Sequence, residues 1–287
     1  MAINIKGMNT GVIRKGDTFV ALAFKIKQPR NKETMLFFPA LVLRDLLIAL
    51  EHRLWQHSQM AEDQRMTLYK ARDAAIKKMH ASIPTLTVEE LQHADASQRV
   101  DTLVLNNHEG ENLLFTLTLH SGEVLDVEIN ELQIALIVQA IIQAINNAKM
   151  RELSLRLSSL LDFLPLYDVD CLDNGSLEYD TYQQPEWKVS LFNYYLAMIY
   201  QYTDEHGKQQ QCGTVVKTRT KSENKHAEAI SHRLLAYSQR LSKLKSKPCQ
   251  VFVRTIAADN THPLSQEQCM RALHQLRMSV KQKKVPA

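Results

Sequence analysis

The residues best suited to chemistry are concentrated in one stretch, from Asp162 to Trp187. It contains seven Asp and Glu residues and no Lys or Arg, and its continuation to Tyr202 holds seven of the nine tyrosines of the chain. Neighbouring carboxylates can bind a hard cation or a basic partner, and tyrosine hydroxyls both donate and accept hydrogen bonds. The spacing of these residues must therefore be tested against a metal site and against a partner-binding surface.

The spacing of the acids does not fit a calcium loop. Asp168, Asp170 and Asp173 precede Gly175, as acids precede a glycine in an EF-hand. An EF-hand loop needs Gly at its sixth position and Glu at its twelfth, whereas Gly175 is eighth here and Tyr179 is twelfth. We therefore expect no metal ion in this stretch.

A second set of acids has the outline of a metal-dependent nuclease. Glu186, Trp187 and Lys188 follow three aspartates; in such enzymes Asp and Glu hold magnesium while Lys stabilises the attacking or leaving oxygen. Pro185, directly before Glu186, argues against a position in the middle of a strand. The nuclease is kept as the last of three alternatives.

Motifs of phosphate-binding loops and common catalytic sites are absent from the sequence. There is no G-x-x-x-x-G-K-S/T, G-x-G-x-x-G or G-x-S-x-G pattern, and the four cysteines form no C-x-x-C pair. We expect thiols packed as small hydrophobic groups, and histidines at the surface, His52 and His57 among them. The protein is expected not to be an enzyme and to bind no cofactor.

Positive charge is concentrated towards the other end of the chain. Residues 212–287 contain 15 Lys and Arg against 4 Asp and Glu, a net charge of +11, whereas residues 1–211 carry a net charge of −7. Repeated cations suit the phosphates of nucleic acid, and nearby tyrosines such as Tyr194 can stack on unpaired bases. Nine residues are predicted to contact nucleic acid: Lys217, Arg219, Lys221, Lys225, Arg233, Arg240, Lys243, Lys245 and Lys247.

The acidic stretch has two interpretations that the sequence leaves open. It can connect two domains and serve as the surface on which the basic region docks, or it can present a negative, aromatic surface to a basic partner protein. The residues predicted to face such a partner are Asp168, Asp170, Asp173, Tyr179, Asp180, Tyr182 and Trp187.

Hydrophobic periodicity predicts the elements that position these residues. Thr87 and Glu90 form a capping-box pattern before a short helix, and Ser265 and Gln268 form another. Strands are expected within 3–38 and at 99–105, 113–120, 123–129, 191–202, 211–218 and 250–256, and longer helices at 40–56, 62–80, 131–147, 151–163, 223–241 and 265–279.

A strand meander closed by an amphipathic helix occurs twice, in units at about 3–57 and 98–148 with a helical insert at 62–94. We therefore predict an α+β fold in three parts. Duplicated antiparallel β-meander plus helix units occupy 1–160, and a basic ββαβα domain occupies 189–287. Between them lies an acidic aromatic connector at 161–188, in which Pro165, Asn174–Gly175 and Pro185 make most of the segment loop.

Two features of the apolar segments bear on location and assembly. The amino terminus lacks the apolar run of a secretory signal, and Leu132–Ile145 falls short of the roughly 20 apolar residues that span a membrane. We expect a cytoplasmic bacterial protein without membrane contact. Because residues 132–148 carry no charge, their helix should be buried nearly all round or lie between subunits of a homo-oligomer.

Several segments together resemble one protein family over the whole chain. They are MAINIKGMNTGVIRK, SSLLDFLPLYDVDCLDNG, LEYDTYQQPEW, PCQVFVRT and EQCMRALH. The resemblance is to the uncharacterised enterobacterial YjeJ family, and it implies relatives of the same fold without implying an activity.

A second resemblance concerns topology. The repeated meander and helix, as in KETMLFFPALVLRDLLIALEHRL, looks like the repeats of PUR-type and whirly single-stranded nucleic-acid binders. That resemblance implies binding through aromatic and basic residues on the sheet, for which the matching candidates are Phe19, Lys25, Lys27, Arg30 and Lys32. The second unit lacks such a basic set.

These observations favour a non-enzymatic, regulatory nucleic-acid-binding protein, with single-stranded DNA or RNA preferred. The alternative is a protein-interaction or regulatory module, related to phage or mobile elements, that uses the acidic aromatic surface.

Overall fold

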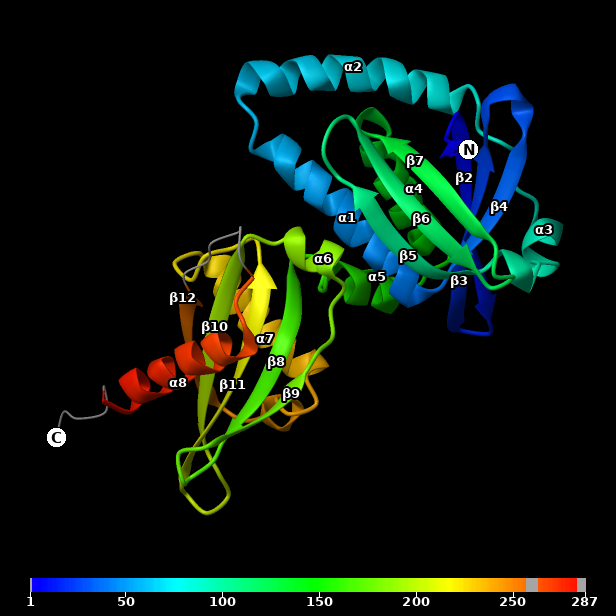
Figure 1. Ribbon diagram of the computed structural model, residues 1–287. Coiled ribbons are helices and arrows are strands. Elements are labelled where there is room, and N and C mark those ends of the chain that lie inside the picture. Colours follow the sequence, from blue (N-terminus) through cyan, green and yellow to red (C-terminus); the bar gives the residue numbers. More distant parts are fainter. Residues whose placement is uncertain (1, 257–262, 283–287) are drawn as a thin grey trace. The chain divides into compact units, whose positions relative to one another are not determined.

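The computed structural model describes residues 2–256 and 263–282 and divides into two compact units, Met1–Leu161 and Asp162–Ala287. Both mix helices with antiparallel sheets, so the α+β class predicted from the sequence is confirmed (Figure 1).

The first unit contains two sheets. One has the strand order β1-β7-β6-β5 and the other the order β2-β3-β4. The strands are β1 (Ile3–Asn4), β2 (Gly7–Lys15), β3 (Thr18–Lys27), β4 (Glu33–Phe38), β5 (Val100–Asn107), β6 (Asn112–Leu119) and β7 (Val124–Asn130), and the helices are α1 (Ala40–Ser58), α2 (Glu62–His80), α3 (Val88–Gln92), α4 (Glu131–Asn147) and α5 (Arg151–Ser158).

Alternating side chains explain how the strands form a core. In β6, Leu113, Phe115, Leu117 and Leu119 are buried while the residues between them are half-exposed, which is the period of two expected for a sheet with one buried face. The capping box that the sequence predicts at Thr87 is present, because the Thr87 hydroxyl accepts from the Glu90 amide and the Glu90 carboxylate accepts in return.

Each sheet of this unit contains a three-stranded meander followed by a helix: β2-β3-β4 leads into α1, and β5-β6-β7 leads into α4. They also differ, because the short strand β1 pairs with β7 in parallel. That the two passages arose by duplication stays a prediction.

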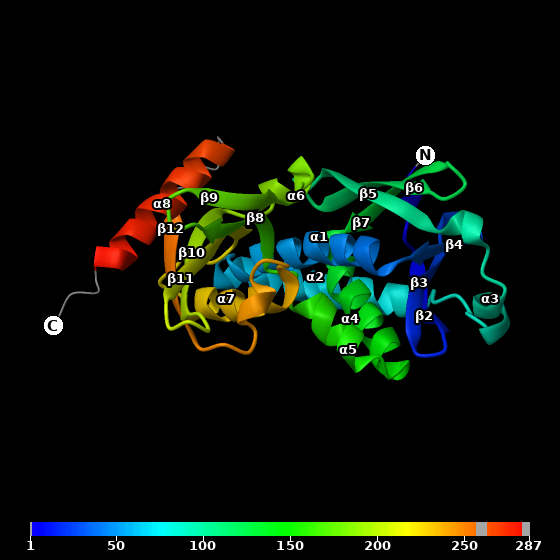
Figure 2. The same ribbon diagram turned by 90° about the horizontal axis from the view of Figure 1, so that it is seen from below.

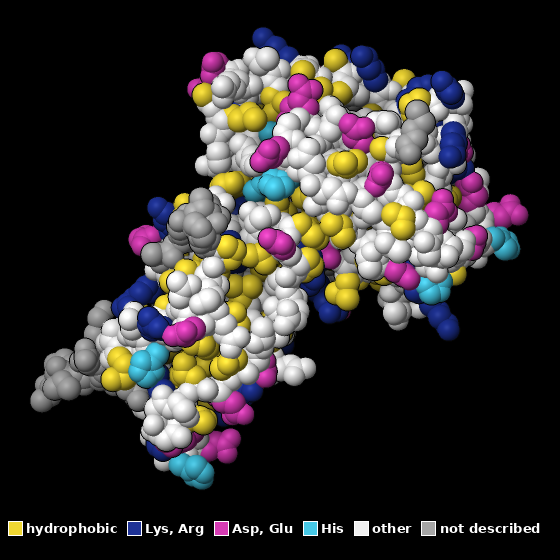
Figure 3. Space-filling model, viewed as in Figure 1, with side chains coloured by type: hydrophobic (Ala, Val, Ile, Leu, Met, Phe, Trp, Pro, Cys, Tyr) yellow, Lys and Arg dark blue, Asp and Glu magenta, His cyan; other side chains and the backbone are white. Residues whose placement is uncertain are grey.

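Of the two alternatives predicted for the uncharged helix α4, burial nearly all round is wrong, and a position between subunits stays a prediction. Six of its residues are buried, but Gln139, Ile142 and Gln143 are exposed on its other side. Polar amides without charge therefore supply its open face, which the absence of charge alone could not reveal. Helix α2 is more open still: Met79 is its one buried residue, and Lys and Arg side chains follow its outer margin (Figure 3).

The second unit is built on one five-stranded sheet with the order β12-β10-β11-β8-β9. Its strands are β8 (Phe163–Cys171), β9 (Leu177–Thr181), β10 (Tyr194–Thr203), β11 (Gln209–Thr218) and β12 (Cys249–Ile256), and its helices are α6 (Glu186–Ser190), α7 (Lys225–Tyr237) and α8 (Gln266–Gln282). The predicted ββαβα order is present as β10-β11-α7-β12-α8.

The sequence predicts that the acidic stretch is a connector made mostly of loop, and this prediction is wrong. It supplies β8 and β9, which pair as a hairpin, and β8 also pairs with β11 along its length. Pro165 is accommodated where the β8–β11 register shifts, and Asn174–Gly175 forms the hairpin turn, with Gly175 at φ +93°. The sequence predicts loop from Pro165 and from the Asn174–Gly175 pair, but a proline at a register shift is compatible with a strand and an Asn-Gly pair is typical of a hairpin turn.

Helices cover both faces of this sheet (Figure 2). Tyr195 and Ile199 pack with Cys269 and Leu273 of α8, whereas the Tyr200 hydroxyl donates to the Ser231 carbonyl of α7 at 2.8 Å. The alternation along β10 therefore sends the tyrosines Tyr195 and Tyr200 to opposite faces of the sheet. In the part of the chain that the structure describes, no helix combines the length and apolarity that crossing a membrane requires.

Candidate functional site

The acids of β8 and β9 face the basic segment that follows α7. The guanidinium of Arg240 donates to Asp170 at 2.8 Å and to Asp180 at 2.6 and 3.0 Å, and so joins the two strands. Hydrogen bonding from Arg240 lowers the pKa of the Asp180 carboxyl below its ordinary value. Lys243 donates to the other oxygen of Asp170 at 2.5 Å.

Further pairs spread along the same unit. Arg233 of α7 makes a bidentate contact with Asp162, with distances of 2.9 and 2.5 Å. Lys208 pairs with Asp173, and Lys247 lies 3.8 Å from Glu205 in the turn between β10 and β11. The basic region thus docks on the acidic stretch within one unit, which was one of the two interpretations that the sequence left open.

Asp168 is buried completely and is not part of an open acidic surface. Its Oδ2 accepts from the Tyr182 hydroxyl at 2.5 Å, and no described residue donates to its Oδ1. Burial, together with the hydrogen bond to Asp168, raises the pKa of Tyr182 well above its ordinary value. These two predicted partner residues therefore bind each other inside the unit.

The other predicted partner residues are more accessible. Tyr179 on β9 is 39% exposed, and its hydroxyl accepts from Gln266. Trp187 is half-buried on α6, with the Lys188 ammonium 5.6 Å from its ring centroid. Asp173 and Asp180 are exposed but paired, as described above.

Lys217 lies in the interior instead of on a cationic surface. Its ammonium donates to the carbonyls of Val189 and Phe192 at 3.0 and 2.8 Å and lies 4.7 Å from the ring centroid of Tyr195. Burial lowers the pKa of this lysine. It cannot reach a phosphate without leaving the core, so it is removed from the set of candidate contacts.

Seven of the nine predicted cations fall into two groups at opposite ends of the sheet; of the other two, Lys217 is buried and Arg233 is paired with Asp162. Arg240, Lys243 and Lys247 lie where β8 and β11 carry Asp170 and Cys212, and Lys245 follows in sequence. Arg219, Lys221 and Lys225 lie where β11 ends, β10 begins and α7 starts. The acids of the unit pair mainly with the first group.

We call the second group, Arg219, Lys221 and Lys225, the cationic end. Two of its cations lie against aromatic rings. The Arg219 guanidinium lies 4.6 Å from the centroid of Phe192, and the Lys221 ammonium lies 5.3 Å from that of Tyr194. Lys221 and Lys225 are exposed and make no ion pair with any acid that the structure describes, although Glu223 lies close to Lys221.

The residues of the predicted nuclease site do not form a metal-binding group in the part of the chain that the structure describes. Glu186 and Lys188 lie on the short helix α6, and the Lys188 side chain is buried. Within residues 2–256 and 263–282, no group of three or more His, Cys, Asp or Glu side chains is placed to hold a metal ion. The four cysteines form no disulfide there, and three of them are buried.

The five N-terminal candidates for nucleic-acid binding, Phe19, Lys25, Lys27, Arg30 and Lys32, differ in exposure and in their partners. Lys25 of β3 pairs with Glu33 at 3.3 Å and with Glu90 at 2.5 Å, and hydrogen bonding to Glu90 raises the pKa of Lys25. Phe19 and Lys27 are half-buried, while Arg30 and Lys32 are exposed in the turn before β4. These residues therefore do not form one cationic strip along the strand.

One cluster of polar side chains around His57 was not predicted from the sequence. The sequence predicts His52 and His57 at the surface, but both are buried. His57 Nε2 lies 3.1 Å from a carboxylate oxygen of Glu131, which Arg53 approaches at 3.3 Å. Arg53 also donates to the carbonyls of His108 and Gly110. The four-residue spacing of Arg53 and His57 places them on one face of α1, and this signal could have identified the cluster.

Comparison with known proteins decides the family. The family model described as YjeJ-like matches residues 1–283. The chain belongs to the YjeJ-like family. It is 57% identical over 286 residues to the Escherichia coli (strain K12) protein named "Uncharacterized protein YjeJ", a match that covers 100% of this chain and 99% of that protein. The family resemblance inferred from the sequence is thereby confirmed, and no solved structure was found to match the chain.

Proposed function

We propose that this YjeJ-like protein binds single-stranded nucleic acid without catalysing a reaction, and that it does so through the cationic end of its second unit. The observation that carries the proposal is the position of the Lys221 ammonium over the half-buried ring of Tyr194, beside the exposed Lys225. Cations contact the phosphates of a strand, and the ring of Tyr194 can stack on an unpaired base. The ring of Phe192 is fully buried and supports the Arg219 guanidinium instead of a base.

The position of the cationic end supports this role. Five acids of the unit are bound to Arg233, Arg240, Lys243 and Lys208, so these acids do not neutralise Lys221 and Lys225; they are Asp162, Asp170, Asp173, Glu178 and Asp180. Lys225 also begins α7, whose amino-terminal amides carry partial positive charge. A single strand is favoured over a duplex because Tyr194 is only half-buried and unpaired bases expose their ring faces to it.

Fluorescence anisotropy with labelled dT20 and rU20 at low salt tests the proposal. The double variant Lys221→Gln, Lys225→Gln should bind at least about tenfold more weakly, since two phosphate contacts are lost. Lys245→Gln, in the same unit but away from the cationic end, is the matched control and should bind as the wild type does. Equal loss in both variants, or no binding by the wild type at low salt, would refute the proposed site.

A second function is favoured by one feature of β9. This strand lies at the edge of the sheet, where no strand among the described residues pairs with its outer backbone groups, and it exposes Glu178 and Tyr179. Such an edge can pair with an extended segment of a partner protein, and the charge of Glu178 would favour a basic segment. Replacing Glu178 by Lys should then abolish capture of a Lys-rich peptide; unchanged capture would exclude this surface.

A further inference from the structure

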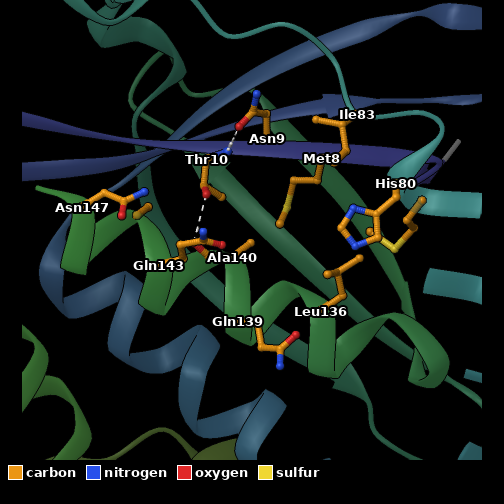
Figure 4. A pocket seen from close by; sticks show the side chains of 12 residues that line it. Met8, Asn9, Thr10, His80, Ile83, Leu136, Gln139, Ala140, Gln143 and Asn147 are labelled. Atoms are coloured by element: carbon orange, nitrogen blue, oxygen red, sulfur yellow. Dashed lines mark hydrogen bonds between the residues drawn. The ribbon is translucent and has the colours of Figure 1, made fainter. Parts of the chain in front are cut away.

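The first unit contains a cavity of about 370 Å³ that the proposed function does not use (Figure 4). Met8, Asn9 and Thr10 of β2 line one side, and α4 lines the other through residues from Leu136 to Asn147. The end of α2 contributes Met79 and His80, and Ile83 follows it. Pockets that hold small molecules have volumes of roughly 300 to 1,000 Å³, so this one suits a compact ligand.

The lining is polar without being charged. None of its twelve residues is Asp, Glu, Lys or Arg. Gln139, Gln143 and Asn147 follow one another at intervals of four along α4, which places their amides in a row on one helix face. None of the three side chains makes a hydrogen bond to another residue that the structure describes. These amides are therefore available to a ligand.

Two residues of β2 complete the polar side and are held in fixed orientations. Asn9 donates to the Pro84 carbonyl at 2.9 Å and accepts from the Thr10 amide at 2.9 Å. The Thr10 hydroxyl donates to the Ala140 carbonyl at 3.1 Å, so its oxygen retains capacity to accept (Figure 4). The cavity therefore offers preset acceptors opposite the movable amides of α4.

We infer that this cavity binds a nucleobase, either of a free nucleoside or of a nucleotide in a strand. A side-chain amide presents a donor beside an acceptor, the pattern that Asn and Gln use to bind the edges of bases. The sulfur atoms of Met8 and Met79, with Leu136 and Ile83, offer the polarizable and apolar walls on which a flat ring packs.

Other ligand classes fit the lining less well. A charged group would lose its hydration here without meeting an opposite charge, which is unfavourable. A sugar carries hydroxyls around its whole rim, and those against Met8, Met79 and Leu136 would be left without partners. A planar heterocycle places its polar groups at the edge and its apolar faces against the walls.

Calorimetric titration of the full chain with adenosine, guanosine, cytidine and uridine tests the inference. At least one nucleoside should bind saturably, and Gln143→Leu should weaken it by about tenfold, as expected for the loss of one or two hydrogen bonds. The control is Asn146→Leu, an exposed position on the same helix that does not line the cavity. Ala140→Leu, which fills the cavity without removing an amide, should also weaken binding.

The inference fails if no nucleoside binds, if Gln143→Leu binds as well as the wild type, or if maltose or N-acetyl-leucine amide binds where nucleosides do not. Competition of an oligonucleotide with the bound nucleoside would identify a base within a strand as the source. Lack of competition would identify the free nucleoside. The nucleoside titration is repeated with the double variant Lys221→Gln, Lys225→Gln, which should still bind the nucleoside in the cavity. The proposal for the cationic end and the inference for the cavity can therefore fail independently of each other.

Discussion

Lys217 shows how the surroundings of one residue decide what its charge can do. In sequence it belongs to a run of cations, but it lies on a strand covered on both faces, and its ammonium is hydrogen-bonded to two carbonyls. Replacing it by Met should lower the free energy of unfolding by about 1 to 3 kcal/mol, because both carbonyls lose their donor. Denaturant unfolding measures this. A variant as stable as the wild type would contradict the buried contacts.

His57 should make stability depend on pH. Burial lowers its pKa below the ordinary value of 6.5, against the opposing effect of Glu131. Below about pH 6.5 the unfolded chain therefore binds a proton that the folded chain does not, so the free energy of unfolding falls as the pH falls through the folded pKa.

The matching experiment compares His57→Gln with the wild type in urea between about pH 7.5 and pH 5. The variant retains a donor for Glu131 but cannot titrate, so its stability should fall less on acidification. His232→Gln, at an exposed position of α7, should follow the wild type. Parallel curves for wild type and His57→Gln would contradict the assigned shift.

At the scale of elements, Arg240 links two strands to the segment after α7. It contacts Asp170 on β8 and Asp180 on β9, and it is itself only 18% exposed. Arg240→Gln should lower the melting temperature at pH 7, and it should speed hydrogen exchange in β9, the edge strand. Arg240 lowers the pKa of Asp180 below its ordinary value of 3.8, so the ion pair stabilises the folded chain at pH values above 3.8. The difference in melting temperature between the wild type and Arg240→Gln should therefore shrink below about pH 4. A constant difference across pH would show that the charge pair is not its cause.

The elements also show where sequence reasoning succeeds. Helix α4 begins and ends where its periodicity predicts, and the capping boxes at Thr87 and Ser265 are both formed. The hairpin β8–β9 was missed because Pro165 and Asn174–Gly175 were taken as loop signals. An Asn-Gly pair between strand-like segments is a strong signal of a hairpin, so this error was avoidable.

The pairing of charges between distant segments could not be predicted in detail. The sequence gives the excess of acids in 162–187 and of cations in 212–287, but which cation meets which acid depends on sheet register. Asp170 meets Arg240 because β8 pairs with β11 and the segment after α7 returns over that face. The amide-lined cavity has the same origin, since Asn9 and Gln143 are far apart in sequence and meet only in the fold.

At the scale of the molecule, the place where the second unit begins has a direct consequence. A fragment starting at Asp162 retains all five strands of the sheet, whereas one starting at Val189, the boundary predicted from the sequence, lacks β8 and β9 and leaves β11 as an open edge. The first should fold on its own and give a dispersed NMR spectrum; the second should aggregate or remain unfolded. A folded fragment from Val189 would contradict the assignment of the acidic stretch to this sheet.

Binding of nucleic acid through the cationic end is tested most directly by the salt dependence of that binding. For the full chain and a single-stranded oligonucleotide, the slope of log K against log salt reports how many phosphates are neutralised. The double variant Lys221→Gln, Lys225→Gln should reduce the magnitude of that slope by about 1.4, since each contact to a single strand contributes about 0.7. Lys245→Gln should leave the slope unchanged. A slope that is the same in the wild type and the double variant would contradict binding through the cationic end.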